Sequence, residues 1–244
     1  MAEESTDRHV ILLHGLFRSR FSLLLLQKAL KDAGYTVHNV GYASSRRSIP
    51  EHAARLAEKL EAELEGASGT LNFVTHSMGG IVTRAYLASH EPPLPVKRVV
   101  MLAPPNQGAQ LAERLKNLWI WSLVGGESGR QLARDEVGPA EMFGRFPVPE
   151  DVELGIIAGG TGDKKGYAPW IEGDNDGVVA VEETRHSSAR DHILLPHVHT
   201  FIMNAKSGIA NVIAFLDEGR FLDEAPRLAP AEGAREDSAR EPAS

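Results

Sequence analysis

The stretch FVTHSMGGIV (residues 73–82) places Ser77 between a short apolar run and a segment with helical spacing. A serine among small residues at such a junction is typical of a nucleophile elbow, a tight strand-to-helix turn that exposes the hydroxyl. The positions two before and two after the serine must be small, and here they are Thr75 and Gly79. Because Thr75 stands where glycine is usual, the pattern alone leaves the role of the serine open.

A serine hydroxyl is a poor nucleophile unless a base removes its proton, and that base needs an orienting acid. After a strand–serine–helix elbow the partners follow in the order Ser, then Asp or Glu, then His. The string GDNDGVVAV supplies Asp176 in a glycine-flanked loop, and LLPHVHTFIM supplies His199 before the last expected helix. The sequence therefore predicts Ser77 as nucleophile, Asp176 as orienting acid and His199 as base.

Other residues compete for these roles. The alternatives for the acid and the base are Asp174, Asp163, Asp191 and His197. The D-N-D-G string is also compatible with a surface turn or a calcium loop. We expect His76, beside the serine, to pack or hydrogen-bond locally rather than to transfer a proton.

A tetrahedral intermediate of acyl transfer needs hydrogen-bond donors for its oxyanion. One donor is the backbone N–H after the nucleophile, here Met78, and the second comes from the loop after an early central strand. That loop is His-Gly-Leu-Phe, in which Gly15 lets the backbone turn and aims the Leu16 N–H at the site. Phe17 is predicted to wall the substrate site, and Arg18 either binds a polar group or pairs with an acid.

The bulk composition excludes several classes of function. The chain has 244 residues, a net charge of −7, 42% hydrophobic and 24% charged residues, which is ordinary for a globular protein without a nucleic-acid footprint. It has no cysteine, which excludes disulfides and thiolate chemistry. The acidic, polar start lacks the features of a secretory signal, and the apolar stretch at residues 23–26 is too short to span a bilayer. We therefore expect a cytoplasmic protein.

Short apolar runs alternate with amphipathic segments along the chain. The expected strands are residues 9–14, 36–42, 70–75, 96–103, 152–158 and 192–195, and the expected helices are residues 19–33, 51–66, 79–90 and 200–216. This alternation predicts an α/β fold with a mostly parallel sheet of about six strands and helices on both faces.

The domain organisation follows from where the alternation stops. We expect a single domain over residues 1–221, with residues 104–150 forming a small cap or lid. That insertion contains the apolar string LKNLWIWSL, whose Trp119 and Trp121 could line an acyl groove, form a buried helix or meet a membrane surface. Residues 222–244 are rich in Ala, Pro, Glu and Arg, which predicts a disordered tail.

These pieces together resemble the α/β-hydrolase superfamily, and within it the small bacterial lipases and esterases. The segments that carry the resemblance are LLHGLFRS (12–19), FVTHSMGGIVTRAYL (73–87), VVMLAPPNQGA (99–109), DGVV (176–179), HTFIM (199–203) and FLDEGRF (215–221). The resemblance implies the same roles for Ser77, Asp176 and His199, with Leu16 and Met78 as oxyanion donors. It departs from the usual pattern in the residues after Gly15, where further glycines are common.

The favoured expectation is a serine hydrolase that cleaves carboxylic esters through an acyl-enzyme, with a small-molecule ester or lipid as substrate. An acyltransferase or thioesterase would use the same triad, and a non-catalytic binding protein could share the scaffold. No cofactor or metal is expected, because the triad and backbone amides supply what the reaction requires. The sequence leaves the oligomeric state open.

Overall fold

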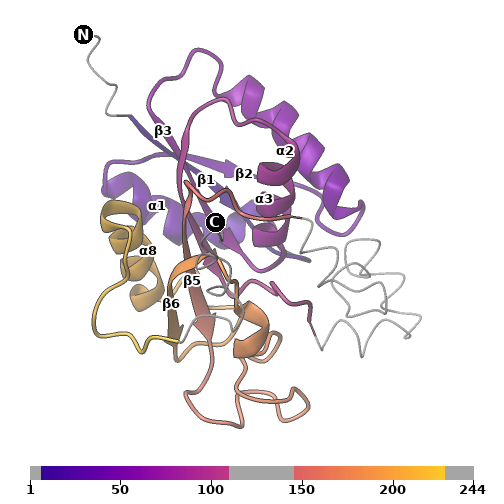
Figure 1. Ribbon diagram of the computed structural model, residues 1–244, viewed down its shortest axis with the longest axis vertical. Coiled ribbons are helices and arrows are strands. Elements are labelled where there is room, and N and C mark those ends of the chain that lie inside the picture. The colour runs from indigo at the N-terminus through magenta and orange to yellow at the C-terminus, as the bar shows by residue number, and fades with distance from the viewer. Residues whose placement is uncertain (1–6, 110–145, 229–244) are drawn as a thin grey trace, which may run out of the picture.

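The computed structural model describes residues 7–109 and 146–228, and within them a six-stranded parallel sheet forms the centre of the molecule (Figure 1). The spatial order is β2-β1-β3-β4-β5-β6, and each neighbouring pair is parallel. The carboxyl ends of all strands therefore share one edge. The strands are β1 (Arg8–Leu13), β2 (Thr36–Val40), β3 (Thr70–His76), β4 (Val96–Leu102), β5 (Glu153–Gly159) and β6 (Ala189–Leu195).

Helices cover both faces of the sheet, which confirms the predicted α/β fold class (Figure 1). α2 (Ile49–Glu63) and α3 (Met78–Ser89) pack on one face, and α1 (Leu24–Asp32) and α8 (Lys206–Glu218) pack on the other. Each face has its own apolar core. The remaining helical elements are the short 3-10 helices η1 (Arg20–Leu23) and η2 (Val181–Thr184).

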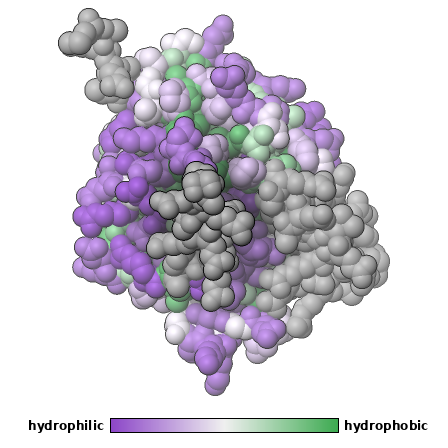
Figure 2. Space-filling view, viewed as in Figure 1, coloured by the Kyte–Doolittle hydropathy of each residue, from purple (hydrophilic) through white to green (hydrophobic). Residues whose placement is uncertain are grey.

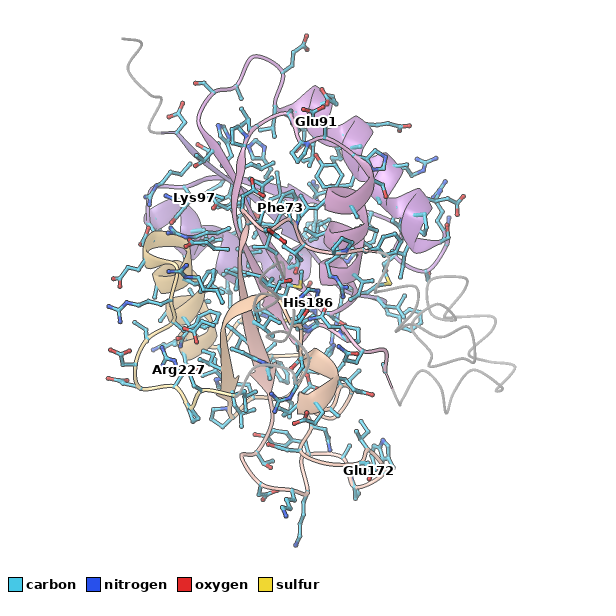
Figure 3. All side chains as sticks on the ribbon, in the orientation of Figure 1. Phe73, Glu91, Lys97, Glu172, His186 and Arg227 are labelled. Carbon is cyan, nitrogen blue, oxygen red and sulfur yellow. The ribbon has the colours of Figure 1, made fainter. Side chains whose placement is uncertain are left out.

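β3 is buried on both sides from Leu71 to His76, as is usual for a central strand of a parallel sheet. Its polar Asn72 is also buried, and the amide donates to the His9 carbonyl. Phe73, near the middle of the molecule in Figure 3, is fully buried and its ring centroid lies 5.9 Å from that of Tyr86 on α3. A central strand packed in this way is a rigid support. It ends at the residue before Ser77.

Local signals set the start of α2. The Ser48 side chain accepts a hydrogen bond from the Glu51 N–H while the Glu51 carboxylate accepts one from the Ser48 N–H, and Pro50 stands in the first turn. This reciprocal cap satisfies two N–H groups that the helix itself leaves unpaired. The helix therefore begins at Ile49, two residues before the predicted start at residue 51.

Two predicted helices have different bounds in the structure. The helix expected over residues 19–33 is divided into η1 and α1, and the last helix begins at Lys206 instead of about Thr200. Before α8 the chain makes turns, in which the N–H groups of Phe201 and Ile202 both donate to the Val198 carbonyl. The adjacent His199 N–H donates to the Asp176 carbonyl at 2.9 Å, so a tertiary contact with the acid loop holds the start of this segment.

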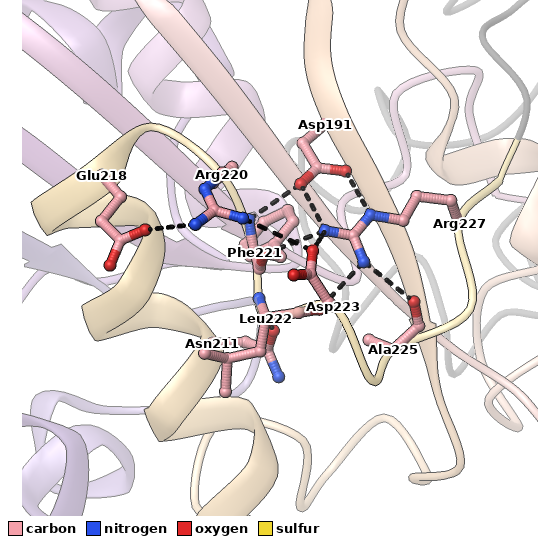
Figure 4. Close-up of polar contacts among 9 residues, drawn as sticks. All are labelled: Asp191, Asn211, Glu218, Arg220, Phe221, Leu222, Asp223, Ala225 and Arg227. Atoms are coloured by element: carbon pink, nitrogen blue, oxygen red, sulfur yellow. Dashed lines mark hydrogen bonds and ion pairs between the residues drawn. The ribbon is translucent and has the colours of Figure 1, made fainter.

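The chain beyond α8 continues along the outer strand of the sheet (Figure 4). Leu194 of β6 donates to the Pro226 carbonyl, and the Arg227 guanidinium lies 3.3 Å from the Asp191 carboxylate. Residues 222–228 thus pack against β6, although the disordered tail was predicted to start at residue 222. The rest of that predicted tail, residues 229–244, lies outside the described residues.

The predicted cap also falls largely outside the described residues, which omit residues 110–145 and with them Trp119 and Trp121. On the face of the molecule seen in Figure 2, hydrophilic side chains predominate and hydrophobic ones occur in small areas. Among the helices that are described, none has the length and apolar content needed to cross a membrane.

Candidate active site

Ser77 occupies the turn between β3 and α3, in an unusual backbone conformation. Its φ is 54° and its ψ is −127°, a region that side chains other than glycine rarely adopt and that costs free energy. The Ser77 N–H donates to the Leu102 carbonyl of β4 at 2.8 Å, which anchors the turn to the sheet. The surrounding structure thus holds a strained serine at the carboxyl edge of the sheet.

Two glycines allow this turn to sit against the end of β1. A Cβ on Gly79 would lie 2.6 Å from the Leu13 carbonyl oxygen, and a Cβ on Gly15 would lie 2.9 Å from the Ser77 Cβ. Both distances are too short for a side chain. The small residue expected at position 79 is therefore required by backbone contact, and the Gly15 loop packs directly on Ser77.

The two predicted oxyanion donors lie on either side of this contact. Met78 is the first residue of α3, and Leu16 follows Gly15 in the loop after β1. In the part of the chain that the structure describes, neither N–H donates to a backbone carbonyl. The first N–H groups of a helix have no acceptor within the helix, so the Met78 N–H is available to an external oxygen.

Asp176 and His199 form a buried pair. The His199 Nδ1 lies 2.6 Å from the Asp176 Oδ2, and the side chain of Asp176 is 1% exposed. The other carboxylate oxygen, Oδ1, accepts the N–H groups of Val178 and Val179 at 2.9 and 2.7 Å. Since a carboxylate accepts, Nδ1 carries the hydrogen, which leaves Nε2 of His199 as the basic nitrogen.

The structure gives the nearest competitors other contacts. Asp174 accepts the backbone N–H groups of Thr161 and Gly162 and so ties the acid loop to the end of β5. The Nε2 of His197 lies 2.6 Å from the Ser207 hydroxyl at the start of α8. Neither residue contributes to the pair that Asp176 forms.

The remaining carboxylates lie elsewhere. Asp163 accepts the Lys165 N–H in an exposed turn, and Asp191 accepts the Phe221 N–H on the outer strand. Within residues 7–109 and 146–228, no group of three or more His, Asp or Glu side chains is arranged to hold a metal ion. The calcium-loop interpretation of D-N-D-G therefore has no ligand cluster in the described structure.

His76 connects the nucleophile turn to the histidine loop. Its Nε2 lies 3.0 Å from the His199 carbonyl oxygen, and the two imidazole centroids are 4.7 Å apart. Burial, and then the nearby charge of His199, hold the pKa of His76 well below its usual value. A neutral imidazole thus donates to His199 from the residue before Ser77, in keeping with the local role expected for it. The hydroxyl of Ser77 and the His199 ring share no hydrogen bond among the described contacts.

Asn175 is a positioning residue that the sequence reasoning missed. Its fully buried side chain accepts the N–H groups of Ala168 and Gly177, and its amide nitrogen lies 2.9 Å from the Gly173 carbonyl and 3.1 Å from the Ala168 carbonyl. It thereby organises the loop that presents Asp176. The signal was the D-N-D-G string itself, which drew attention only to its carboxylates.

The structure also shows how Arg18 and Phe17, in the loop after β1, are placed. Arg18 donates to the Thr200 hydroxyl at 2.8 Å, which joins the loop after β1 to the turn after β6. Phe17 is 48% exposed and has a φ of 56°. A bulky residue in this left-handed region is strained, as Ser77 is.

Residues 1–122, half of the chain, match a family model described as "Domain of unknown function (DUF7379)". The chain belongs to this family. No curated protein matches this chain.

Solved structures resemble this DUF7379 member in fold. The mature Bacillus licheniformis lipase BlEst2 has a TM-score of 0.66 and 19% identity, covering 88% of this chain and 92% of that one. The metagenomic carboxyl esterase MGS0156 has a TM-score of 0.61 and 18% identity, covering 81% and 66%. A putative thioesterase from Silicibacter sp. TM1040 has a TM-score of 0.57 and 16% identity, covering 88% and 78%. The DUF7379 chain therefore has the α/β-hydrolase fold.

Proposed function

We propose that this protein is a serine hydrolase that cleaves carboxylic esters through an acyl-enzyme intermediate. The observation that carries the proposal is the buried Asp176–His199 pair, held by His76 beside the strained Ser77 turn. A buried carboxylate on Nδ1 fixes the histidine tautomer and stabilises the imidazolium that forms during proton transfer. The fold shared with a lipase and a carboxyl esterase supports the same reading.

In the first half-reaction the Ser77 oxygen bonds to the ester carbonyl carbon while His199 Nε2 takes the hydroxyl proton. The N–H groups of Leu16 and Met78 donate to the oxyanion of the tetrahedral intermediate. Collapse of this intermediate breaks the ester C–O bond, and His199 returns the proton to the departing alcohol. Water then attacks the acyl-serine by the same route and releases the carboxylic acid.

Phe17 is the proposed substrate-binding residue. It directly follows Leu16, and its half-exposed aromatic ring belongs to the loop that packs on Ser77. We infer that the ring forms a wall for the apolar part of the ester, and that the strained backbone is the cost of presenting it there.

A thioesterase or an acyltransferase is the second candidate, since the same residues can act on a thioester or deliver the acyl group to an alcohol. The fold shared with a putative thioesterase supports this second candidate. A thioester substrate and an added alcohol acceptor distinguish these activities. Faster formation of a new ester than of free acid would identify a transferase.

The first experiment measures hydrolysis of p-nitrophenyl esters of increasing acyl length by the wild type and by Ser77→Ala. We expect the variant to lose activity by at least about a thousandfold, because no other group can form the acyl-enzyme. The chain-length profile separates an esterase from a lipase. Full activity in Ser77→Ala would exclude this serine, and an inactive wild type would favour a binding protein.

The acid is tested by a matched pair of neighbours, Asp176→Asn and Asp174→Asn. We expect Asp176→Asn to reduce kcat by about a thousandfold or more, because the amide no longer enforces the basic tautomer of His199. Asp174→Asn should reduce kcat by about tenfold or less, since the amide keeps one oxygen to accept an N–H group of the loop after β5 and does not contact His199. Equal effects of the two substitutions would contradict the assignment.

A further inference from the structure

Large hydrophobic side chains gather on one part of the surface. Eight such residues are exposed in the described part of the chain, and five of them follow the carboxyl ends of β1 and β6. These five, called the apolar rim below, are Phe17, Phe21, Leu24, Leu25 and Phe201. Phe21 and Phe201 are 65% and 63% exposed. Solvent contact of this extent is unfavourable for each ring, so their grouping needs an explanation.

The two segments of the rim are neighbours in space. Arg18 Nη2 donates to the Thr200 hydroxyl, which joins the residue after Phe17 to the residue before Phe201. Beneath the surface, the buried side chains next to the rim residues belong to one core cluster, which contains Leu23, Leu26, Ile202 and Met203. The rim therefore lies over a single rigid support at the edge of the sheet that carries Ser77.

The rim also has a charge that contrasts with the rest of the protein. The whole chain has a net charge of −7, but residues 14–25, which carry four of the five rim residues, contain two arginines and no Asp or Glu. Both arginines, Arg18 and Arg20, are exposed within the rim, and the Arg20 guanidinium lies 5.4 Å from the centre of the Phe21 ring. The rim thus presents aromatic and aliphatic side chains together with positive charge.

We propose that the apolar rim docks the protein on an anionic lipid surface. Phe and Leu side chains gain by entering the boundary between headgroups and acyl chains, and Lys and Arg are attracted to anionic headgroups. Docking in this orientation places the carboxyl edge of the sheet against the lipid. Taken with the proposed function, on which this part rests, the ester substrates would be drawn from that surface.

Charge argues for lipid over a second copy of the chain. A two-fold dimer through the rim would bring the arginines of both copies together without a carboxylate from residues 8–31 to pair with them. An anionic membrane neutralises the same charges. Tyr167 and Trp170 are exposed on another loop of this edge. The charges of that loop are mixed, so we leave it outside the rim; they are Asp163, Lys164, Lys165 and Glu172.

The test measures sedimentation of the full-length Ser77→Ala protein with vesicles of phosphatidylcholine, with and without phosphatidylserine. Because the nucleophile is absent, binding is measured independently of hydrolysis. We expect binding to the phosphatidylserine vesicles, weakened by salt, and much weaker binding to phosphatidylcholine alone.

Paired variants locate the surface. Phe21→Ser with Leu25→Ser should weaken binding roughly tenfold or more, whereas Leu222→Ser, an exposed residue outside the rim, should have little effect. Arg20→Glu should weaken binding roughly tenfold. Lys97→Glu makes the same change in an exposed residue at the amino end of β4 (Figure 3) and should change binding by less than about twofold.

The proposal is overturned if the phosphatidylserine vesicles are not bound, or if the rim variants bind as the controls do. It is also overturned if the rim substitutions alter the sedimenting mass of the free protein instead of vesicle binding, since the rim would then be a protein interface. Failure of the ester assay with intact vesicle binding would reject the proposed hydrolase and leave the docking surface in place.

Discussion

The turn that carries Ser77 and the loop that carries Asp176 meet at the same edge of the sheet, yet they are held by different forces. The serine turn is fixed by close backbone approach, with Gly15 and Gly79 lying where no side chain fits. The acid loop is fixed by hydrogen bonds, chiefly those of Asp174 and the buried amide of Asn175. The first depends on steric contact between two short segments, the end of β1 and the serine turn, and the second on a polar network spread over a long loop.

The two regions should therefore respond differently to substitution. Steric exclusion between backbone atoms cannot be relieved by moving a flexible side chain, so an added methyl group must displace a strand or the turn itself. A hydrogen-bonded loop loses one contact at a time, and neighbouring N–H groups can recover some of them from water. The serine turn should therefore be the less tolerant of the two.

The largest effect is expected for Gly79→Ala. Its Cβ would lie 2.6 Å from the Leu13 carbonyl oxygen, and relieving this contact should cost about 3 kcal/mol in the free energy of unfolding. Ester hydrolysis should fall by more than about a hundredfold, because Ser77 is displaced. Urea unfolding and the ester assay measure both quantities. Gly41→Ala is the control, since its Cβ would make only ordinary contacts at 3.5 Å or more.

An intermediate effect is expected for Asn175→Ala. The substitution leaves the buried N–H of Ala168 and the half-buried N–H of Gly177 without their acceptor, which should destabilise the protein by about 2 kcal/mol. Because the loop then holds Asp176 less firmly, kcat should fall more than KM changes. Asn72→Ala is the control, a buried asparagine whose amide makes one hydrogen bond, to the His9 carbonyl. A kcat loss as large in Asn72→Ala would contradict the role given to Asn175.

The smallest effect concerns acid stability near the acid loop. Burial lowers the pKa of His192, which contacts Thr184 of η2, to about 4. The unfolded chain protonates this histidine near pH 6.5 while the folded chain does not, so stability is full above pH 6.5 and declines as the pH falls toward about 4. Between pH 7 and pH 5.5, the free energy of unfolding of His192→Gln should therefore fall by about 1 kcal/mol less than that of the wild type. Thermal unfolding at a series of pH values measures the difference, and parallel curves would count against it.

The contrast between steric contacts and hydrogen bonds also explains which features could be predicted from the sequence. The elbow around Ser77 and the six strands were accessible because steric demands and hydrophobic runs are written in consecutive residues. The choice of Asp176 over Asp174, and of His199 over His197, remained open along the chain, since both members of each pair are two residues apart in similar loops. In the structure Asp176 and His199 are hydrogen-bonded to each other. Asp174 instead accepts the Thr161 N–H, and His197 contacts the Ser207 hydroxyl.

Sequence by itself thus determined the α/β fold class, the strand order along the chain and the strained position of Ser77, because these depend on local pattern and on which residues are small. Tertiary structure alone decided the start of α8, the packing of residues 222–228 on β6, the work of Asn175 and the meeting of Arg18 with Thr200. Each of these rests on hydrogen bonds between segments that only the folded sheet brings together, and a polar side chain's partner is not encoded in its immediate neighbours.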